Sequence, residues 1–227
     1  MWRPTAVASV SAVNPITLAI PKGRIGEQLC PVFERAGIDP SCLRIQDRRL
    51  IRETPDGRYR FLQLKPDDVP TYVEYGVADF GISGRDTLLE RRYDLYQLVD
   101  LGVGKCRMVV AEPNPSHTQL TGGATAAAVL RVATKYPGIA AEHFARQGVH
   151  PEIIYVAGSV ELAPLVGLAD VIVDLVESGN TLKENGLVER EVICPISSVL
   201  VANRALFKLR HQELSSVARR LADAVRQ

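Results

Sequence analysis

The sequence has few cysteines, and none of them lie close together. Its four cysteines are scattered over 227 residues without a CxxC spacing: Cys30, Cys42, Cys106 and Cys194. Closely or regularly spaced cysteines are typical of zinc sites and disulfide frameworks. The pattern argues against both and indicates buried or free thiols in a reducing cytosol. The four histidines also show no metal-ligand spacing, so no protein-held metal is expected.

Long hydrophobic runs and an excess of charge of one sign are missing as well. No run of about 18 apolar residues occurs, so no transmembrane helix is expected. Residues 1–15 are too polar and short for a signal peptide, and we expect a loose extension of a cytoplasmic protein. A net charge of +1 gives no reason to expect a nucleic-acid or membrane partner. Any anion-binding site must therefore be local.

Two common catalytic motifs are also absent. The sequence contains no GxxxxGK[ST] loop and no GxSxG turn. Their absence argues against a P-loop nucleotide hydrolase and against an α/β hydrolase.

What the sequence does contain is an alternation of short apolar runs and helix-like segments. Apolar residues make up 46% of the chain, enough for a sizeable core. The expected strands are 16–20, 44–47, 59–64, 78–84, 95–112, 131–136, 152–157, 170–176 and 191–203. The expected helices are 21–37, 68–77, 87–94, 138–147, 159–168, 181–186 and one amphipathic helix at the C-terminus.

This order predicts an α/β fold with two lobes. Repeated β-α-β units favour mostly parallel sheets with helices on both faces. The two long extended runs, 95–112 and 191–203, enclose a self-contained α/β block and suit two strands that cross between lobes. We therefore expect lobe I to comprise 1–104 and 195–227, lobe II to comprise 105–194, and a ligand to bind in the cleft.

The segment 170–186, DVIVDLVESGNTLKENG, is the strongest candidate for a binding site. After a parallel strand, the next helix begins with unpaired N–H groups and a positive dipole end. Gly179 permits close approach, and Ser178 and Thr181 add hydroxyl donors, so Ser178-Gly179-Asn180-Thr181 suits a phosphate monoester. Asp174 suits two neighbouring ribose hydroxyls. The alternative is an ordinary capped helix after a strand.

A second cluster, Lys22-Gly23-Arg24, also lies between a strand and a helix. Its cations suit a departing polyphosphate with Mg²⁺, although a solvated helix start is the simpler interpretation. Arg48-Arg49, Lys105 and Arg107 are surface charges unless they face the same cleft. Glu161 suits either a helix cap or a hydroxyl contact.

Several motifs together resemble one enzyme family. The segments LAIPKGR, DRRL, DVPTYVEYGVADFGISGRD, LGVGKCRMVVA, RVATKYP, GSVELAPLVGLAD and DLVESGNTLKENGL follow one another between residues 16 and 207. In this order they are similar to ATP phosphoribosyltransferase, and 158–187 is the most specific part. The resemblance implies a fold like the type II periplasmic binding proteins. It also implies condensation of ATP with 5-phosphoribosyl 1-pyrophosphate at N1 of adenine, with Mg²⁺ required, as the first step of histidine biosynthesis.

The resemblance also implies roles for individual residues. It assigns the 5-phosphate to 178–181, the ribose hydroxyls to Asp174 and Glu161, and the pyrophosphate or ATP phosphates to Arg24 and Arg49. It assigns Lys22, Gly23 and Arg107 to the same anion-binding surface. The length resembles the short form, which implies a homodimer within a hetero-oligomer that contains a histidyl-tRNA-synthetase-like regulatory subunit.

Two other functions remain open at this stage. A solute-binding protein or ligand sensor can have the same two-lobed fold without catalysis. A phosphoribosyltransferase acting on another base would carry the same loop, because that loop recognises the sugar phosphate and not its acceptor.

Overall fold

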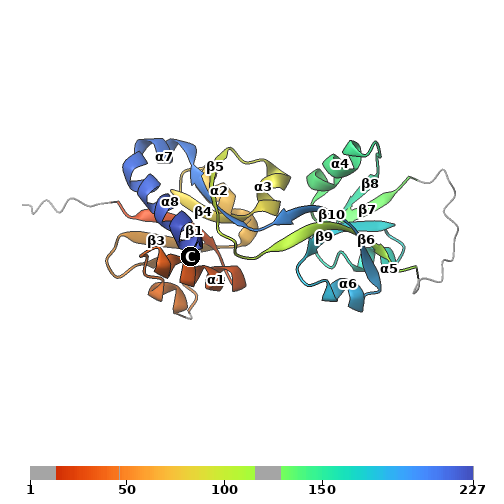
Figure 1. Ribbon diagram of the computed structural model, residues 1–227, viewed down its shortest axis with the longest axis horizontal. Coiled ribbons are helices and arrows are strands. Elements are labelled where there is room, and N and C mark those ends of the chain that lie inside the picture. The colour runs from red at the N-terminus through yellow and green to blue at the C-terminus, as the bar shows by residue number, and fades with distance from the viewer. Residues whose placement is uncertain (1–13, 46, 116–128, 227) are drawn as a thin grey trace, which may run out of the picture.

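The computed structural model describes residues 14–45, 47–115 and 129–226. Residues 1–13 of the expected N-terminal extension lie outside these residues. The described elements gather in two groups placed side by side along the long axis of the molecule, each built on one sheet (Figure 1).

Six strands form the first sheet of the described chain, in the order β2-β3-β1-β4-β11-β5. Their bounds are β1 Ile16–Pro21, β2 Ile51–Glu53, β3 Tyr59–Leu64, β4 Phe80–Gly84, β5 Leu95–Asp100 and β11 Ser198–Asn203. The accompanying helices are α1 Arg24–Arg35, α2 Val69–Glu74, α3 Arg85–Arg91, α7 Arg204–Leu209 and α8 His211–Arg226, with short 3₁₀ turns η1 Ser41–Arg44 and η2 Pro66–Asp68.

The second sheet has five strands within the described residues, in the order β10-β6-β9-β7-β8. Their bounds are β6 Cys106–Pro113, β7 Arg131–Thr134, β8 Glu152–Tyr155, β9 Val171–Val176 and β10 Leu187–Ile196. Its helices are α4 Pro137–Arg146, α5 Leu162–Leu165 and α6 Asn180–Glu184. None of the helices in the described parts of the chain combines the length and apolarity needed to cross a membrane.

Both sheets are mixed, and the expectation of mostly parallel sheets is wrong in this respect. β1 pairs in parallel with β3 and β4, and β7 pairs in parallel with β8 and β9. The remaining pairs are antiparallel. Most of the antiparallel strands, β5, β6, β10 and β11, flank the two passages of the chain between sheets. A strand that returns from the other sheet enters from the opposite end, and it therefore pairs antiparallel.

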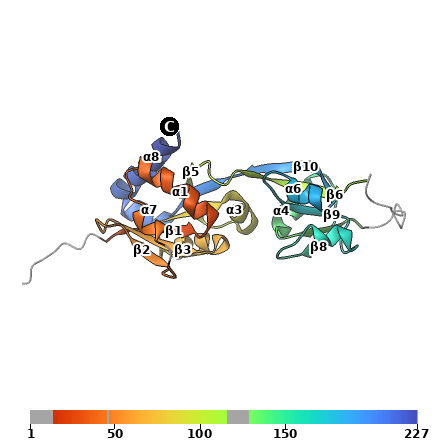
Figure 2. The ribbon, with the colours of Figure 1, turned by 90° about the horizontal axis from the view of Figure 1, so that it is seen from below.

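Apolar side chains cover both faces of each sheet. In the first sheet, one face packs Phe33 and Leu29 of α1 with Leu221 of α8, and the other packs Val69 and Val73 of α2. Figure 2 shows α1 and α8 lying side by side on the first of these faces. In the second sheet, α4 covers one face, and α5 with α6 covers the other. Burial of these helix faces holds the helices against the sheets and so fixes the positions of the strand ends, where a binding site can form.

Several element predictions differ from the structure. Residues 44, 45 and 47 are not a strand, because the Asp47 carboxylate accepts the Arg49 N–H at 2.7 Å and favours a turn. The helix expected over 159–168 is only Leu162–Leu165, and the chain turns at Gly167, which has a φ of 72°. The C-terminal helix is two helices separated at Arg210.

The strand expected over 191–203 begins at Leu187 and is interrupted at Ser197. There the Ser197 hydroxyl donates to Asp100 Oδ2 at 2.7 Å, and its carbonyl accepts the Arg85 N–H at 3.0 Å. The chain thus turns from one sheet into the other at a position held by hydrogen bonds.

Replacing Gly81 with alanine should destabilise the first sheet. A Cβ at Gly81 would lie 2.5 Å from Val73 Cγ2 and 2.9 Å from Val69 Cγ1, both on α2. Overpacking of this kind costs about 1–3 kcal/mol. Urea denaturation of the variant should show this loss in the free energy of unfolding. Gly158→Ala is the matched control, because nothing lies within 4 Å of the added carbon, and equal stability of the two variants would contradict the argument.

Candidate active site

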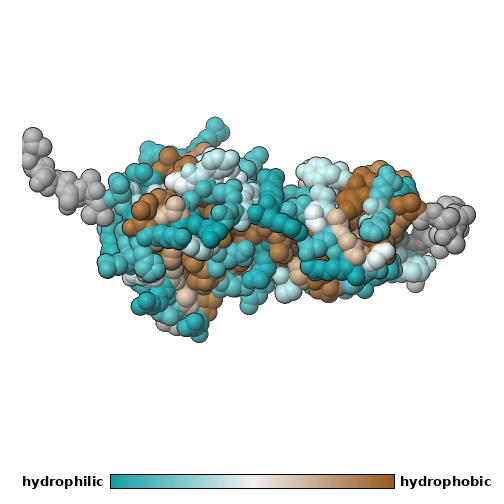
Figure 3. Space-filling view, turned by 90° about the horizontal axis from the view of Figure 1, so that it is seen from above, coloured by the Kyte–Doolittle hydropathy of each residue, from teal (hydrophilic) through white to brown (hydrophobic). Residues whose placement is uncertain are grey.

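A cavity of about 340 Å³ lies between the two sheets. From the first sheet and its helices it is lined by residues that include Pro21, Arg24, Ile82, Gly84, Asp86 and Ser198. From the second it is lined by Cys106, Lys135, Tyr136, Leu175 and Ile196. The ends of β1, β4, β7 and β9 therefore face one space. In Figure 3 the molecule narrows between the two groups of elements, where hydrophilic side chains cross the surface.

Polar contacts join the two groups beside this cavity. The Lys135 ammonium lies 2.8 Å from an Asp67 oxygen, and the Tyr136 hydroxyl donates to Asp86 Oδ2 at 3.0 Å. The Glu90 carboxylate of α3 accepts the N–H groups of Gly138 and Ile139, at 2.8 and 3.0 Å, at the start of α4. Helix α4 has no side-chain cap from its own N-terminal residue, so Glu90 satisfies two of its unpaired donors.

The loop after β9 offers unpaired backbone donors. Within the described residues, no acceptor is found for the N–H groups of Ser178, Gly179 and Thr181, while the Asn180 N–H points to Ser178 Oγ at 3.4 Å. Gly179 adopts a φ of 81°, which a glycine accepts without strain. Helix α6 is a single turn of five residues, so its dipole is small. An anion at this loop would therefore be bound by individual N–H and hydroxyl groups and not by a helix dipole.

Arg107 lies directly against this loop. Its Nη1 donates to the Glu177 carbonyl at 3.1 Å, and its Nη2 would lie 3.9 Å from a Cβ at Gly179. The same guanidinium pairs with the Glu189 carboxylate of β10, with Nη2 at 2.6 Å from Oε2. Arg107, which the resemblance assigns to the anion-binding surface, therefore lies beside the loop.

Arg24 reaches the same loop from the other sheet. Its Nη1 and Nη2 donate to the two carboxylate oxygens of Glu177 at 2.9 and 2.8 Å. Both side chains are more than half exposed. Gly23 begins α1 with a φ of 77°, and the exposed Lys22 holds its position through a backbone hydrogen bond to Leu64.

Asp174 occupies the middle of β9 and precedes Leu175, which lines the cavity. Burial raises the pKa of its carboxyl group, and the negative charge of Glu161 raises it further, while Lys135 lowers it. The Leu175 N–H donates to Asp174 Oδ1 at 2.8 Å. The two carboxylates predicted to act together, Asp174 and Glu161, therefore lie near enough to influence each other. Glu161 stands immediately before α5 and makes no side-chain cap there.

Arg49 lies at the same edge of the first sheet as Lys22, but it is not in contact with the loop. The Gln63 N–H donates to the Leu50 carbonyl, which places the start of β2 beside the end of β3. β3 is the neighbour of β1, so Arg49 lies about two strand spacings, roughly 10 Å, from Lys22. Its side chain is 82% exposed and pairs loosely with Asp47, at 3.8 Å.

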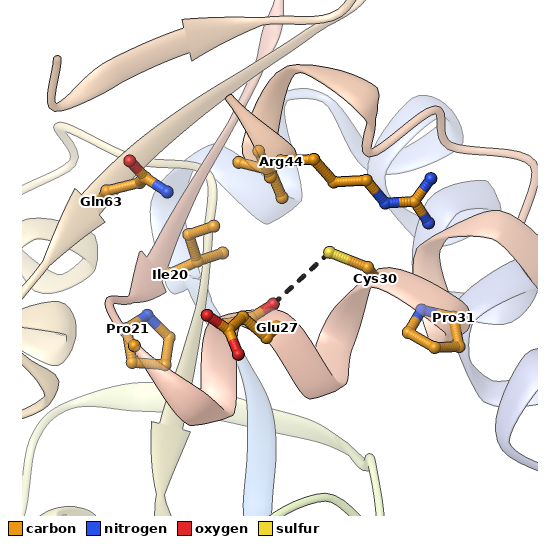
Figure 4. A pocket seen from close by; sticks show the side chains of 10 residues that line it. Ile20, Pro21, Glu27, Cys30, Pro31, Arg44 and Gln63 are labelled. Atoms are coloured by element: carbon orange, nitrogen blue, oxygen red, sulfur yellow. Dashed lines mark hydrogen bonds between the residues drawn. The ribbon is translucent and has the colours of Figure 1, made fainter. Parts of the chain in front are cut away.

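Between these two positions lies a second cavity, of about 420 Å³ (Figure 4). Its walls come from the end of β1, helix α1, η1 and β3, and include Ile20, Pro21, Glu27, Cys30, Arg44 and Gln63. A Cβ at Gly26 would lie 2.5 Å from the Pro21 carbonyl oxygen, so α1 approaches β1 closely here only because residue 26 is glycine. Pro21 lines both cavities.

The groups in the first cavity do not supply a nucleophile at neutral pH. Burial raises the pKa of the Cys106 thiol to about 11, so it stays protonated. Burial also raises the pKa of Tyr136 far above its ordinary value, and nearby Asp86 adds to this effect. The site thus offers hydrogen-bond donors, cations and carboxylates. Such a set suits binding and charge stabilisation rather than covalent catalysis.

Several residues of this region were missed by the sequence analysis. Lys135 and Tyr136 follow β7 directly, and Asp86 follows β4, so their position after parallel strands was a usable signal. Glu177 and Glu189 were missed for another reason. Their arginine partners lie 153 and 82 residues away, and no local pattern indicates such pairs.

Comparison with known proteins identifies the family. The protein-family model described as HisG, ATP phosphoribosyltransferase, matches residues 65–223. The ATP phosphoribosyltransferase of Sorangium cellulosum is 56% identical over 93% of this chain and 96% of that protein, and ATP phosphoribosyltransferase 2 of Geobacter sulfurreducens is 48% identical over 89% and 94%. A solved ATP phosphoribosyl transferase (HisG:HisZ) complex from Thermotoga maritima matches with a TM-score of 0.75 and 35% identity, over 92% of this chain and 97% of that one. The chain therefore belongs to the ATP phosphoribosyltransferase family.

Proposed function

We propose that the cavity between the two sheets is the active site of this transferase. The family transfers a 5-phosphoribosyl group to ATP in the first step of histidine biosynthesis, and the chain is a pentosyltransferase of this kind. The observation that carries the site assignment is the set of unpaired N–H groups at 178–181, which lie against Arg107 and within reach of Arg24.

The two sheets would be the cores of two lobes like those of type II periplasmic binding proteins. Lobe I would comprise 1–104 with 195–227, and lobe II would comprise 105–194. This division is supported by the two chain passages, which lie between β5 and β6 and at Ser197. Substrates would then enter between lobes, where the ends of parallel strands meet.

In this site each part of 5-phosphoribosyl 1-pyrophosphate has a matching group. The 5-phosphate would accept hydrogen bonds from the N–H groups of Ser178, Gly179 and Thr181 and from Asn180 and the hydroxyls. The ribose hydroxyls would donate to Asp174 and Glu161. The diphosphate would lie against Arg24, with Lys22, Gly23, Arg49 and Arg107 around it.

The reaction needs little proton transfer. N1 of adenine carries no proton at neutral pH, so no general base is required. Catalysis would consist of placing N1 behind C1′ and stabilising the charge that develops on the departing pyrophosphate. The protonated Cys106 and Tyr136 fit this scheme, because neither acts as a base.

Mg²⁺ would enter as part of the substrate, bound to diphosphate oxygens. The carboxylates Asp67 and Asp86 in the cavity wall are engaged by Lys135 and Tyr136. Within the described residues no three His, Cys, Asp or Glu side chains gather at one point. The available donor set therefore fits an ion carried by a polyphosphate.

A regulatory partner is the second part of the proposal. The Thermotoga maritima relative was solved as a HisG:HisZ complex. The curated relatives have a similar length, since the chain covers 96% of one and 94% of another. We propose that this chain is a short-form catalytic subunit of the cytoplasm, a homodimer that assembles with a histidyl-tRNA-synthetase-like subunit and is inhibited by histidine through it.

One assay tests this function. Purified protein would be mixed with ATP, 5-phosphoribosyl 1-pyrophosphate and Mg²⁺, with and without the partner subunit, while the near-ultraviolet absorbance of N1-substituted adenine is followed. We expect product only with both substrates and more of it with the partner. Product from another base, or no product in either condition, would overturn the proposal.

Replacing Asp174 with asparagine should weaken binding of 5-phosphoribosyl 1-pyrophosphate, by about 10–100-fold, because a carboxylate that accepts two hydroxyls is lost. Because the pKa of Asp174 is raised, its carboxylate becomes protonated at a higher pH than that of an ordinary aspartate. The affinity of the wild type for 5-phosphoribosyl 1-pyrophosphate should therefore begin to fall at this higher pH when the solution is acidified. Calorimetric titration across pH measures both effects. Glu152→Gln, on an exposed strand position, is the control, and unaltered binding by the Asp174 variant would count against the ribose assignment.

A further inference from the structure

The two guanidinium groups beside the phosphate-binding loop are both occupied by carboxylates of the protein. Arg24 pairs with Glu177 through two hydrogen bonds, and Arg107 pairs with Glu189. The two pairs differ in what they join. Arg107 and Glu189 belong to neighbouring strands of one sheet, whereas Arg24 belongs to the first sheet and Glu177 to the loop after β9 in the second.

Glu177 stands immediately before Ser178 in the chain. A phosphate held by 178–181 would therefore lie close to its carboxylate, and like charges at short distance repel. Glu177 is ionised at neutral pH, because its hydrogen bonds to Arg24 lower the pKa of its carboxyl group. A diphosphate that accepts hydrogen bonds from Nη1 and Nη2 of Arg24 takes the place that Glu177 occupies in the structure.

We propose that Glu177 is an internal competitor of the diphosphate for Arg24, and so a positioning residue that acts through this arginine. The proposal rests on the proposed function of the site. Both side chains are more than half exposed, with exposed fractions of 61% for Arg24 and 55% for Glu177, and exposed pairs are weak. A diphosphate offers more anionic oxygens to the guanidinium than one carboxylate does, so the exchange favours the substrate.

The exchange has two consequences for the reaction. Before substrate binds, Glu177 keeps the Arg24 side chain extended across the gap between the sheets, with its charge compensated. After the exchange, the same guanidinium faces the diphosphate, and the direct link between α1 and the loop is gone. The price of this arrangement is a lower substrate affinity than the cations alone would give.

The test is Glu177→Gln, measured with the partner subunit present. We expect the KM for 5-phosphoribosyl 1-pyrophosphate to fall by about three- to tenfold, the size of a modest charge contribution, with kcat changed by less than about twofold. Glu177→Asp, which keeps the charge, should restore a KM close to that of the wild type. Glu53→Gln removes the same charge from an exposed ion pair with Arg60, elsewhere on the first sheet, and should change neither constant.

Binding of pyrophosphate with Mg²⁺, followed by calorimetry, gives a readout that does not need turnover. Pyrophosphate should bind more tightly to Glu177→Gln than to the wild type. This difference in affinity should be smaller when the same comparison is made with Arg24→Ala present in both proteins. An unchanged or raised KM together with unchanged pyrophosphate binding would overturn the role of Glu177. Failure of the wild type to form product would instead overturn the proposed function, and the binding experiment would still decide the competition.

Discussion

Replacing Arg24 with alanine should lower kcat by about 100- to 1,000-fold, as expected when a group that stabilises developing charge is removed. The departing pyrophosphate gains charge as its bond to C1′ breaks, and Arg24 of α1 reaches the loop after β9 through its pair with Glu177. Single-turnover kinetics with both substrates saturating measures this step. Arg49→Ala should also lower turnover, because Arg49 lies at the same edge of the sheet.

The fold should survive both substitutions. Arg24 and Arg49 are largely exposed, and exposed ion pairs contribute little to stability. Urea denaturation should therefore give the wild-type free energy of unfolding. Arg60→Ala, which removes another exposed arginine of the first sheet, is the matched control and should keep wild-type turnover. Wild-type rates for both Arg24→Ala and Arg49→Ala would contradict the proposal that these arginines stabilise the departing pyrophosphate.

Replacing Asp79 with alanine should destabilise the protein by about 3–5 kcal/mol, the usual cost of removing one partner of a buried ion pair. Asp79 is 4% exposed, and its carboxylate accepts Arg210 Nη1 at 2.9 and 3.0 Å and the Thr17 N–H at 2.8 Å. The alanine variant leaves a partly buried guanidinium and a backbone donor without their partner. Equilibrium denaturation by urea measures the loss.

The asparagine variant separates the two contributions. Asp79→Asn keeps an oxygen for the Thr17 N–H and removes the charge, so it should lose less stability than the alanine variant. Asp223→Asn is the matched control, because Asp223 forms an exposed pair with Arg226 at 3.8 Å. Equal stability of Asp79→Ala and wild type would show that the pair contributes nothing to folding.

The sequence predicts most of the strands and helices and the loop 178–181 after β9, because both depend on local patterns. The apolar run before Asp174 and the Ser178-Gly179 turn are contiguous, and their strand-to-loop order determines where the donors lie. The positions of Lys22, Gly23 and Arg24 follow in the same way from β1. Their roles in catalysis stay predictions until the variants are measured.

What the sequence could not predict depends on pairings between particular side chains, some of which lie far apart in the chain. The turn at Asp47 is stabilised by its pairing with the buried Arg52, which apolar periodicity does not reveal. The break in the C-terminal helix coincides with Arg210, whose guanidinium turns toward Asp79, 131 residues earlier. The occupation of Arg24 by Glu177 likewise requires two sheets to be placed beside each other first.

The cap that Glu90 provides for α4 couples two levels of structure that are usually described separately. The acceptor for the first N–H groups of this helix is 48 residues away in sequence and belongs to the other sheet. Moving the two sheets apart would expose those N–H groups to solvent. Formation of the first turn of α4 is therefore coupled to the relative position of the sheets. Part of the secondary structure of residues 137–146 is therefore encoded outside them, and the first turn of the helix depends on the contact with Glu90 of α3.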